Sequence, residues 1–212
     1  REEGVQYSLA DRGGELFILT NADGAIDFKV VTAPLASPER ANWRDLIPHR
    51  EGIYVLDVEL YAGHMVRLER ANALPAIIIR DLKTGEEHAI AFDEAAYSLD
   101  TMGSYEFETT NLRFSYSSMT TPSEVYDYDM AARTRVLRKR QEIPSGHNPA
   151  DYVTTRIMAP SHDGALVPVS ILHRKDLVRD GSAPLLLYGY GSYGMAMPAS
   201  FSANRLSLVD RG

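Results

Sequence analysis

A glycine- and tyrosine-rich segment, Pro184–Gly194, holds the residues of this sequence that are best suited to chemistry. It reads PLLLYGYGSYG, an apolar run followed by small and phenolic residues. The apolar run predicts a strand buried on both faces, as in a mixed α/β sheet, and binding sites form where such strands end. A tyrosine hydroxyl there can donate a hydrogen bond to a developing oxyanion, and the glycines let the chain turn without a Cβ clash. We therefore predict a buried strand that runs into an active-site loop.

The same glycines formally match a dinucleotide-binding fingerprint. Gly189–Gly194 fits G-x-G-x-x-G, and the glycines follow an expected strand. Against this, Tyr190 and Tyr193 are bulky where a pyrophosphate approaches the backbone, and Pro198 falls where the next helix should be in its first turns. No second parallel strand with a ribose-binding carboxylate can be placed after them. A third interpretation is a glycine-rich turn whose tyrosines pack locally.

Other catalytic constellations are missing from the sequence. No G-x-S-x-G motif occurs, because Ser192 lies in GSYG and lacks a glycine two residues before it. The histidines do not have the spacing of a metal site such as H-E-x-x-H, and we expect surface or structural roles for all of them. They are His49, His64, His88, His147, His162 and His173. We interpret Asp127 and Asp129 as structural rather than as a catalytic pair, and we expect neither a cofactor nor a metal.

Composition narrows the class of protein. The chain has 212 residues, 44% of them hydrophobic and 24% charged, as in globular proteins. Its net charge of −7 argues against a nucleic-acid partner, and we interpret the basic run Arg133–Arg140 as a solvated strand face. No apolar run approaches the ~20 residues of a membrane span, so no membrane partner is expected. The absence of cysteine excludes disulfides and cysteine nucleophiles, and it leads us to expect a cytoplasmic, reducing location.

Short strands of apolar or alternating residues dominate the sequence up to residue 140. Turn signals such as Gly13-Gly14 lie between them. The strands fall into three sets of four, with the period of about 40–50 residues that is typical of a propeller blade. The expected strands are 5–10, 15–20, 26–33 and 42–47, then 53–60, 63–70, 74–81 and 86–91, then 104–109, 111–119, 123–130 and 134–140. A β-sandwich with similar strand counts is the alternative fold.

The character of the sequence changes near residue 143, where a stretch rich in Pro, Gly and Asn predicts a linker. Beyond it, the extended runs Tyr152–Ala159 and Ala165–His173 flank an Asp-Gly turn signal and predict a hairpin. Phe201–Asp210 has the pattern of a short helix.

These elements predict two domains. We expect a partial β-propeller at 1–142, a linker at 143–151, and the N-terminal part of an α/β domain at 152–212. The predicted fold class is therefore a β-propeller portion of about three four-stranded blades, followed by the beginning of an α/β domain.

Several stretches of the second part resemble the prolyl oligopeptidase family of serine peptidases, and most of all its oligopeptidase B branch. They read VPVSILHRK at 167–175, LLLYGYGSYG at 185–194, SFS at 200–202 and RLSL at 205–208. The match is dense over about 150–212 and looser over 1–149, where the three strand sets agree with the family's propeller. The resemblance implies a seven-bladed β-propeller that caps an α/β-hydrolase domain. It also implies that this chain spans the end of the propeller and the start of the hydrolase domain.

The resemblance also implies roles for two tyrosines. Tyr190 matches the family's oxyanion-hole tyrosine, and Tyr193 matches an aromatic residue that lines the S1 pocket. The triad of Ser, Asp and His lies further downstream in the family, as do the acidic residues that select Arg or Lys, and none has a counterpart here. The implied activity is hydrolysis of short, basic peptides together with the remainder of the parent chain. We expect this chain alone to be inactive, and the alternative function is a propeller-based peptide- or protein-binding module.

Overall fold

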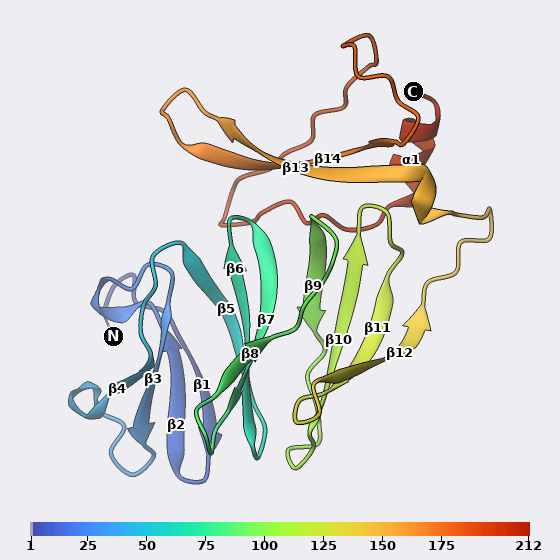
Figure 1. The fold of residues 1–212 in the computed structure, drawn as a ribbon. Coiled ribbons are helices and arrows are strands. Elements are labelled where there is room, and N and C mark those ends of the chain that lie inside the picture. Colours follow the sequence, from blue (N-terminus) through green and yellow to red (C-terminus); the bar gives the residue numbers. More distant parts are fainter. Residues whose placement is uncertain (1) are drawn as a thin grey trace. The chain divides into compact units, whose positions relative to one another are not determined.

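The computed structural model describes residues 2–212, which divide into two compact units. The first unit contains the residues up to Ala91 together with Thr101–Arg113 and Tyr128–Arg135. The second contains Phe92–Asp100, Phe114–Asp127 and Val136–Gly212. Within the described residues, the strands form three four-stranded sheets and one two-stranded hairpin, which are labelled in Figure 1.

The first sheet is an antiparallel meander in chain order. Its strands are β1 (Tyr7–Arg12), β2 (Glu15–Thr20), β3 (Lys29–Pro34) and β4 (Arg44–Ile47). Short 3-10 helices, η1 (Ala22–Gly24) and η2 (Arg40–Asn42), lie in the connections. Both glycines of the β1–β2 turn, Gly13 and Gly14, have positive φ (59° and 85°), a conformation that glycine adopts without strain. The predicted hairpin turn is confirmed.

Both faces of the first sheet are buried. On one face, Phe17 and Leu19 pack in a cluster with Val30, Val55 and Met65. On the other face, a second cluster contains Ile18, Val31 and Ala33, with Leu16 and Trp43 packed against it. Because side chains alternate between the faces of a strand, a run such as ELFILT can serve both clusters at once. Burial of each such aliphatic side chain contributes about 1.5–3 kcal/mol.

The second sheet repeats this design. Its strands are β5 (Ile53–Leu60), β6 (His64–Ala71), β7 (Leu74–Asp81) and β8 (Glu87–Ala89), which pair antiparallel in chain order. The β6–β7 turn consists of Asn72 and Ala73, both with positive φ (49° and 60°). All four strands were predicted from the sequence to within two residues at each end.

The centre of the second sheet contains a buried ionic network. Arg67 is 0% exposed. Its Nε donates to Glu69 Oε1 at 2.8 Å, and its Nη1 and Nη2 donate to the two carboxylate oxygens of Glu87 at 2.8 and 2.9 Å. Arg50 also binds Glu69, and Arg80 also binds Glu87. The hydrogen bonds from Arg67 lower the pKa of Glu87 to about 2.

The third sheet has the order β12-β11-β10-β9. Its strands are β9 (Tyr97–Thr101), β10 (Asn111–Ser118), β11 (Glu124–Asp129) and β12 (Thr134–Arg140). Three of the four were predicted, but the strand expected at 104–109 is wrong. That segment is a loop in which Tyr105 is fully exposed and Phe107 is 44% exposed. The strand forms earlier because Tyr97 and Phe92 pack on each other and on Tyr116 of β10, with ring centroids 4.9–5.7 Å apart.

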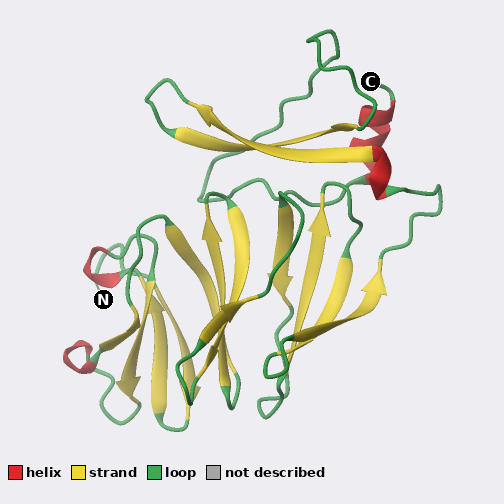
Figure 2. Cartoon of the chain, viewed as in Figure 1, coloured by secondary structure: helices red, strands yellow, loops and turns green. Residues whose placement is uncertain are grey.

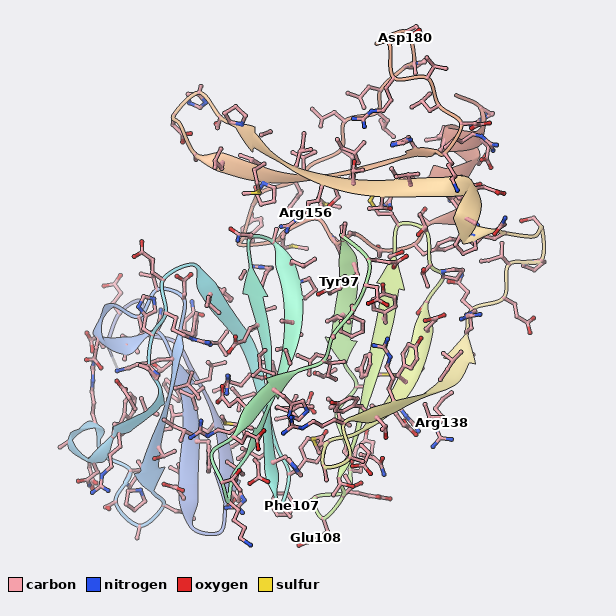
Figure 3. The ribbon with its side chains drawn as sticks, in the orientation of Figure 1. Tyr97, Phe107, Glu108, Arg138, Arg156 and Asp180 are labelled. Carbon is pink, nitrogen blue, oxygen red and sulfur yellow. The ribbon has the colours of Figure 1, made fainter. Side chains whose placement is uncertain are left out.

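The basic run on β12 is exposed along its whole length, as predicted for a solvated strand. Acidic neighbours balance much of its charge. Arg138, which Figure 3 labels on this outer strand, donates to Asp127 at 2.7 Å, and Arg140 donates to Glu124 at 2.6 Å. Asp129 accepts hydrogen bonds from the N–H groups of Ala131 and Ala132 and so closes the β11–β12 turn. The two aspartates are structural groups here.

One histidine within the first unit gives a pH-dependent contact. The ring of His88 on β8 lies 3.0 Å (Nε2) from the Tyr128 hydroxyl on β11, and burial lowers the pKa of His88 below 6.5. A lowered histidine pKa means that the unfolded state takes up the proton more readily. Its contribution to stability is therefore complete above about pH 6.5 and is lost as the pH falls through the folded-state pKa.

We accordingly expect the urea concentration at the unfolding midpoint to decrease when the pH is lowered from 7.5 to 5.5. We expect this decrease to be smaller in His88→Gln. His162→Gln is the matched control, because His162 is exposed. Equal pH dependence in the wild type and in His88→Gln would show that His88 does not contribute to it.

The hairpin predicted after the linker is confirmed. The 3-10 helix η3 (Pro149–Asp151) leads into β13 (Tyr152–Pro160), which pairs antiparallel with β14 (Leu166–Arg174). The predicted helix is α1 (Ala203–Asp210), whose first turn is capped by the Ser202 hydroxyl. Among residues 2–212, no helix combines the length and the apolar character that crossing a bilayer requires.

The strand predicted at 184–188 is absent. Residues 183–200 form irregular loop, with no strand between β14 and α1 (Figure 2). The apolar side chains of this segment are also exposed, at 83% for Leu185 and 81% for Leu187. A strand is held by backbone hydrogen bonds to a neighbour, and none of the described residues offers this segment a pairing strand. The prediction of a buried strand over 184–188 is therefore wrong, because an apolar run becomes a strand only where a neighbouring strand pairs with it.

Candidate functional site

The tyrosines singled out from the sequence lie on the loop between β14 and α1. Tyr190 is 57% exposed and Tyr193 is 92% exposed. Neither hydroxyl has a hydrogen-bond partner in the part of the chain that the structure describes. Both hydroxyls are therefore free to interact with a further group, and the exposure of Tyr193 argues against local packing of that ring.

The backbone of this loop is sharply turned. Gly191, Tyr193 and Gly194 all have positive φ (89°, 55° and 69°), and the N–H of Met195 donates to the carbonyl of Ser192 at 3.0 Å. A side chain at Gly191 would be strained by this conformation. The glycines thus perform the turning role that was expected of them.

The dinucleotide fingerprint does not have its required setting. That motif binds a pyrophosphate at a helix N-terminus that directly follows a strand and the glycines. Here the glycines follow loop rather than strand, and α1 begins at Ala203, nine residues after Gly194. The geometry disfavours dinucleotide binding, in agreement with the sequence-based argument from Tyr190, Tyr193 and Pro198.

One serine–histidine pair lies at the hairpin tip. Ser161 Oγ is 3.4 Å from His162 Nδ1, and a hydrogen bond from Ser161 contributes to the lowered pKa of Asp163, after that from the N–H of Ala165. A catalytic relay requires the carboxylate to orient the histidine, whereas here the carboxylate contacts the serine. All three residues serve an exposed turn. Within the described residues, no group of His, Asp and Glu side chains could hold a metal ion.

The hairpin contains buried polar atoms that have no hydrogen-bond partner, and nothing in the sequence pointed to them. Among residues 2–212, four buried side-chain atoms of the hairpin have no hydrogen-bond partner: Thr154 Oγ1, Thr155 Oγ1, Arg156 Nη2 and His173 Nε2. The charge of Arg156 also acts on Tyr97 of β9, toward which it lies in Figure 3. Buried polar groups in folded proteins are almost always paired. No sequence signal marks these atoms, because their burial depends on the hairpin pairing.

The fold and the loop can be compared with known proteins. A family model described as "Prolyl oligopeptidase, N-terminal beta-propeller domain" matches residues 1–141. Dipeptidyl aminopeptidase BI of Pseudoxanthomonas mexicana is 44% identical over the whole chain, which covers 29% of that protein. Protease 2 of Moraxella lacunata is 24% identical over the whole chain, which covers 30% of its length.

Solved structures give the same result. Oligopeptidase B from Trypanosoma brucei, in a closed form with covalently bound antipain, matches with a TM-score of 0.92 and 30% identity, over 100% of this chain and 31% of that one. The chain thus spans less than a third of the length of these relatives. These matches confirm the propeller that the three strand sets predicted, and the alternative prediction of a β-sandwich is wrong. This chain belongs to the prolyl oligopeptidase family.

Proposed function

We propose that this chain is the propeller-to-hydrolase section of a serine peptidase that cleaves short peptides after Arg or Lys. The observation that carries the proposal is the match of the whole chain, including the part beyond the propeller, to an oligopeptidase B structure. In such an enzyme a serine attacks the scissile carbonyl, a histidine accepts its proton, and an aspartate orients the histidine. We assign these three groups to sequence that follows residue 212, because the chain has no nucleophile motif.

We assign residues 1–142 to the propeller, 143–151 to the linker and 152–212 to the start of an α/β-hydrolase domain. The end of the family match at residue 141 supports the first boundary. The exposed apolar run of 184–188 supports the last assignment, because it has the composition of a buried strand and lacks only its neighbours. The unpaired polar atoms of the hairpin likewise favour a larger structure around β13 and β14.

In this proposal Tyr190 donates its hydroxyl to the oxyanion, beside a backbone N–H next to the nucleophile. Tyr193 lines the pocket for the side chain that precedes the scissile bond. The free phenols and the sharp turn at Gly191 support these roles, because an accessible hydroxyl on a tightly turned loop can be aimed at a bound carbonyl.

The charge of the chain agrees with basic peptides as substrates. A net charge of −7 attracts cationic ligands and repels nucleic acid. The proposed chemistry uses neither a metal nor a cofactor, and we propose a cytoplasmic location, in line with the absence of cysteine.

The purified 212-residue chain should release no chromophore from a chromogenic Arg-peptide substrate. The protein that extends beyond residue 212 in the same reading frame should hydrolyse the substrate and react with a fluorophosphonate serine probe. Hydrolysis by the 212-residue chain would contradict our placement of the triad. An extended protein that binds peptides but neither reacts with the probe nor cleaves them would instead be a propeller-based binding module.

A further inference from the structure

One face of the hairpin carries polar side chains that have no partner in the described part of the chain. Thr154 and Arg156 are two positions apart on β13, so their side chains lie on the same face, about 7 Å apart along the strand. Thr154 Oγ1 and Arg156 Nη2 are buried, and neither has a hydrogen-bond partner among residues 2–212. No acidic side chain in that range forms a salt bridge with Arg156.

This face of the hairpin looks toward the end of the third sheet. Tyr152, on the same face, stacks on His147, whose Nε2 lies 2.6 Å from the carbonyl oxygen of Thr120 in the β10–β11 turn. Further along the face, Arg156 lies toward Tyr97 of β9 (Figure 3), close enough for its charge to act on the phenol. All of these residues belong to the second unit.

Tyr97 adds a third unpaired group. Its ring is held by the aromatic cluster around it, with centroids 5.1 Å from Phe92 and 5.7 Å from Tyr116. Its hydroxyl forms no hydrogen bond with any residue that the structure describes. Burial raises the pKa of Tyr97, so the phenol keeps its proton at neutral pH and can donate it. A guanidinium and two hydroxyls, all able to donate, therefore lie on facing sides of the hairpin and β9.

The chemistry of these groups selects the ligand. A guanidinium has only N–H donors and keeps its charge, and a buried charge without an opposite charge is costly. Its flat fork of donors fits the oxygens of a carboxylate or of a phosphate. One guanidinium neutralises a carboxylate in full. A phosphate carries about two negative charges and would leave an excess in a chain whose net charge is already −7.

We propose that Arg156, Thr154 and Tyr97 form a binding site for a carboxylate, with the guanidinium as its ion-pair partner and the two hydroxyls as further donors. The carboxylate belongs either to the free C-terminus of a peptide or to an Asp or Glu side chain of the parent protein outside residues 1–212. The site goes beyond the proposed peptidase function and uses none of the groups assigned to catalysis. Only the second source assumes the longer protein of that proposal.

Peptide binding by the 212-residue chain tests the site directly. The probes are N-acetyl-trialanine with a free C-terminal carboxylate and the same peptide with a C-terminal amide, neither of which contains Arg or Lys. NMR titrations that follow the backbone amide signals of β13 measure both affinities. We expect the acid to bind at least about tenfold more tightly than the amide, because the amide cannot accept charge-assisted hydrogen bonds.

Substitutions separate the contributions of the three side chains. Arg156→Met should abolish the preference for the acid, and Arg156→Lys, which keeps the charge but not the fork, should retain only part of it. Thr154→Val and Tyr97→Phe each remove one hydroxyl and should weaken acid binding by about two- to tenfold. Arg179→Met is the matched control, because it removes the same charge from an exposed residue of the second unit. It should leave the preference unchanged, and circular dichroism shows that each variant is folded.

The longer protein distinguishes the two sources of the carboxylate. If the ligand is a peptide terminus, the longer protein should keep the preference for the acid, and Arg156→Met should abolish it there as well. If the ligand is a side chain of the parent protein, the longer protein should show no preference. Arg156→Met should then lower its urea midpoint much more than it lowers that of the 212-residue chain.

Equal affinity of the 212-residue chain for the acid and the amide would overturn the proposal. A preference that survives in Arg156→Met, or that is lost equally in Arg179→Met, would do the same. Inorganic phosphate that binds more tightly than the acid would overturn the choice of a carboxylate. None of these measurements involves hydrolysis, so a failure of this site can be told apart from a failure of the proposed peptidase function.

Discussion

Replacing Tyr190 by phenylalanine in the proposed full-length peptidase should lower kcat by about 10²–10³-fold, the effect of losing one oxyanion donor. The substitution removes one oxygen atom and leaves the ring, so substrate binding should change much less than turnover. The hydroxyl faces a neutral carbonyl in the ground state and an oxyanion in the transition state, so its hydrogen bond is much stronger in the transition state. Steady-state kinetics with a chromogenic Arg-peptide would measure both kcat and KM.

The matched control for this experiment is Tyr188→Phe. Tyr188 lies two residues earlier and loses the same hydroxyl oxygen, and our proposal gives that hydroxyl no part in the oxyanion hole. We expect its kcat to be unchanged. An unchanged kcat in Tyr190→Phe would remove Tyr190 from the oxyanion role, and an equal loss in both variants would point to a disturbed loop rather than to a lost donor.

Replacing Arg67 by methionine should destabilise the chain by about 3–5 kcal/mol, the cost of breaking a buried ion pair by removing one partner. Arg67 is fully buried in the second sheet and donates to two carboxylates. Methionine fills much of the volume but leaves Glu69, whose side chain is 6% exposed, with Arg50 alone. Chemical unfolding of the purified chain in urea, followed by circular dichroism, would measure the loss.

Arg80→Met is the control for the charge of the network. Arg80 also binds Glu87, at 3.0 Å, but its side chain is 24% exposed. Water can replace its hydrogen bonds, so we expect a loss below about 1 kcal/mol. Equal losses for Arg67→Met and Arg80→Met would show that burial does not set the strength of this network.

Most strands of the three sheets could be read from the sequence, because their signals are local. Alternation of side chains fixes which residues face a core, and glycine pairs such as Gly13-Gly14 mark the turns. The hairpin β13–β14 and the helix α1 were predicted for the same reason. The family could be read as well, since the residues of 184–194 are distinctive even where their conformation is not as expected.

The errors fall where a strand depends on contacts that no local pattern contains. Residues 104–109 alternate like a strand, yet Tyr97–Thr101 takes the place in the sheet because an aromatic cluster packs around Tyr97. Likewise, the apolar run 184–188 has the composition of a buried strand but no strand beside it. Composition shows which side chains of a segment could be buried, but pairing with a neighbouring strand decides whether the segment becomes a strand and buries them.

Taken by itself, the sequence determined the repeated four-stranded sheets, the change of character near residue 143 and the glycine-rich turn that contains Tyr190 and Tyr193. The tertiary structure alone revealed the network around Arg67 and the contact of His147 with Thr120. Both join residues whose neighbours are set by strand register and by the path of the linker. Such contacts depend on distances between segments far apart in the chain, and residue types alone do not encode these distances in any local pattern.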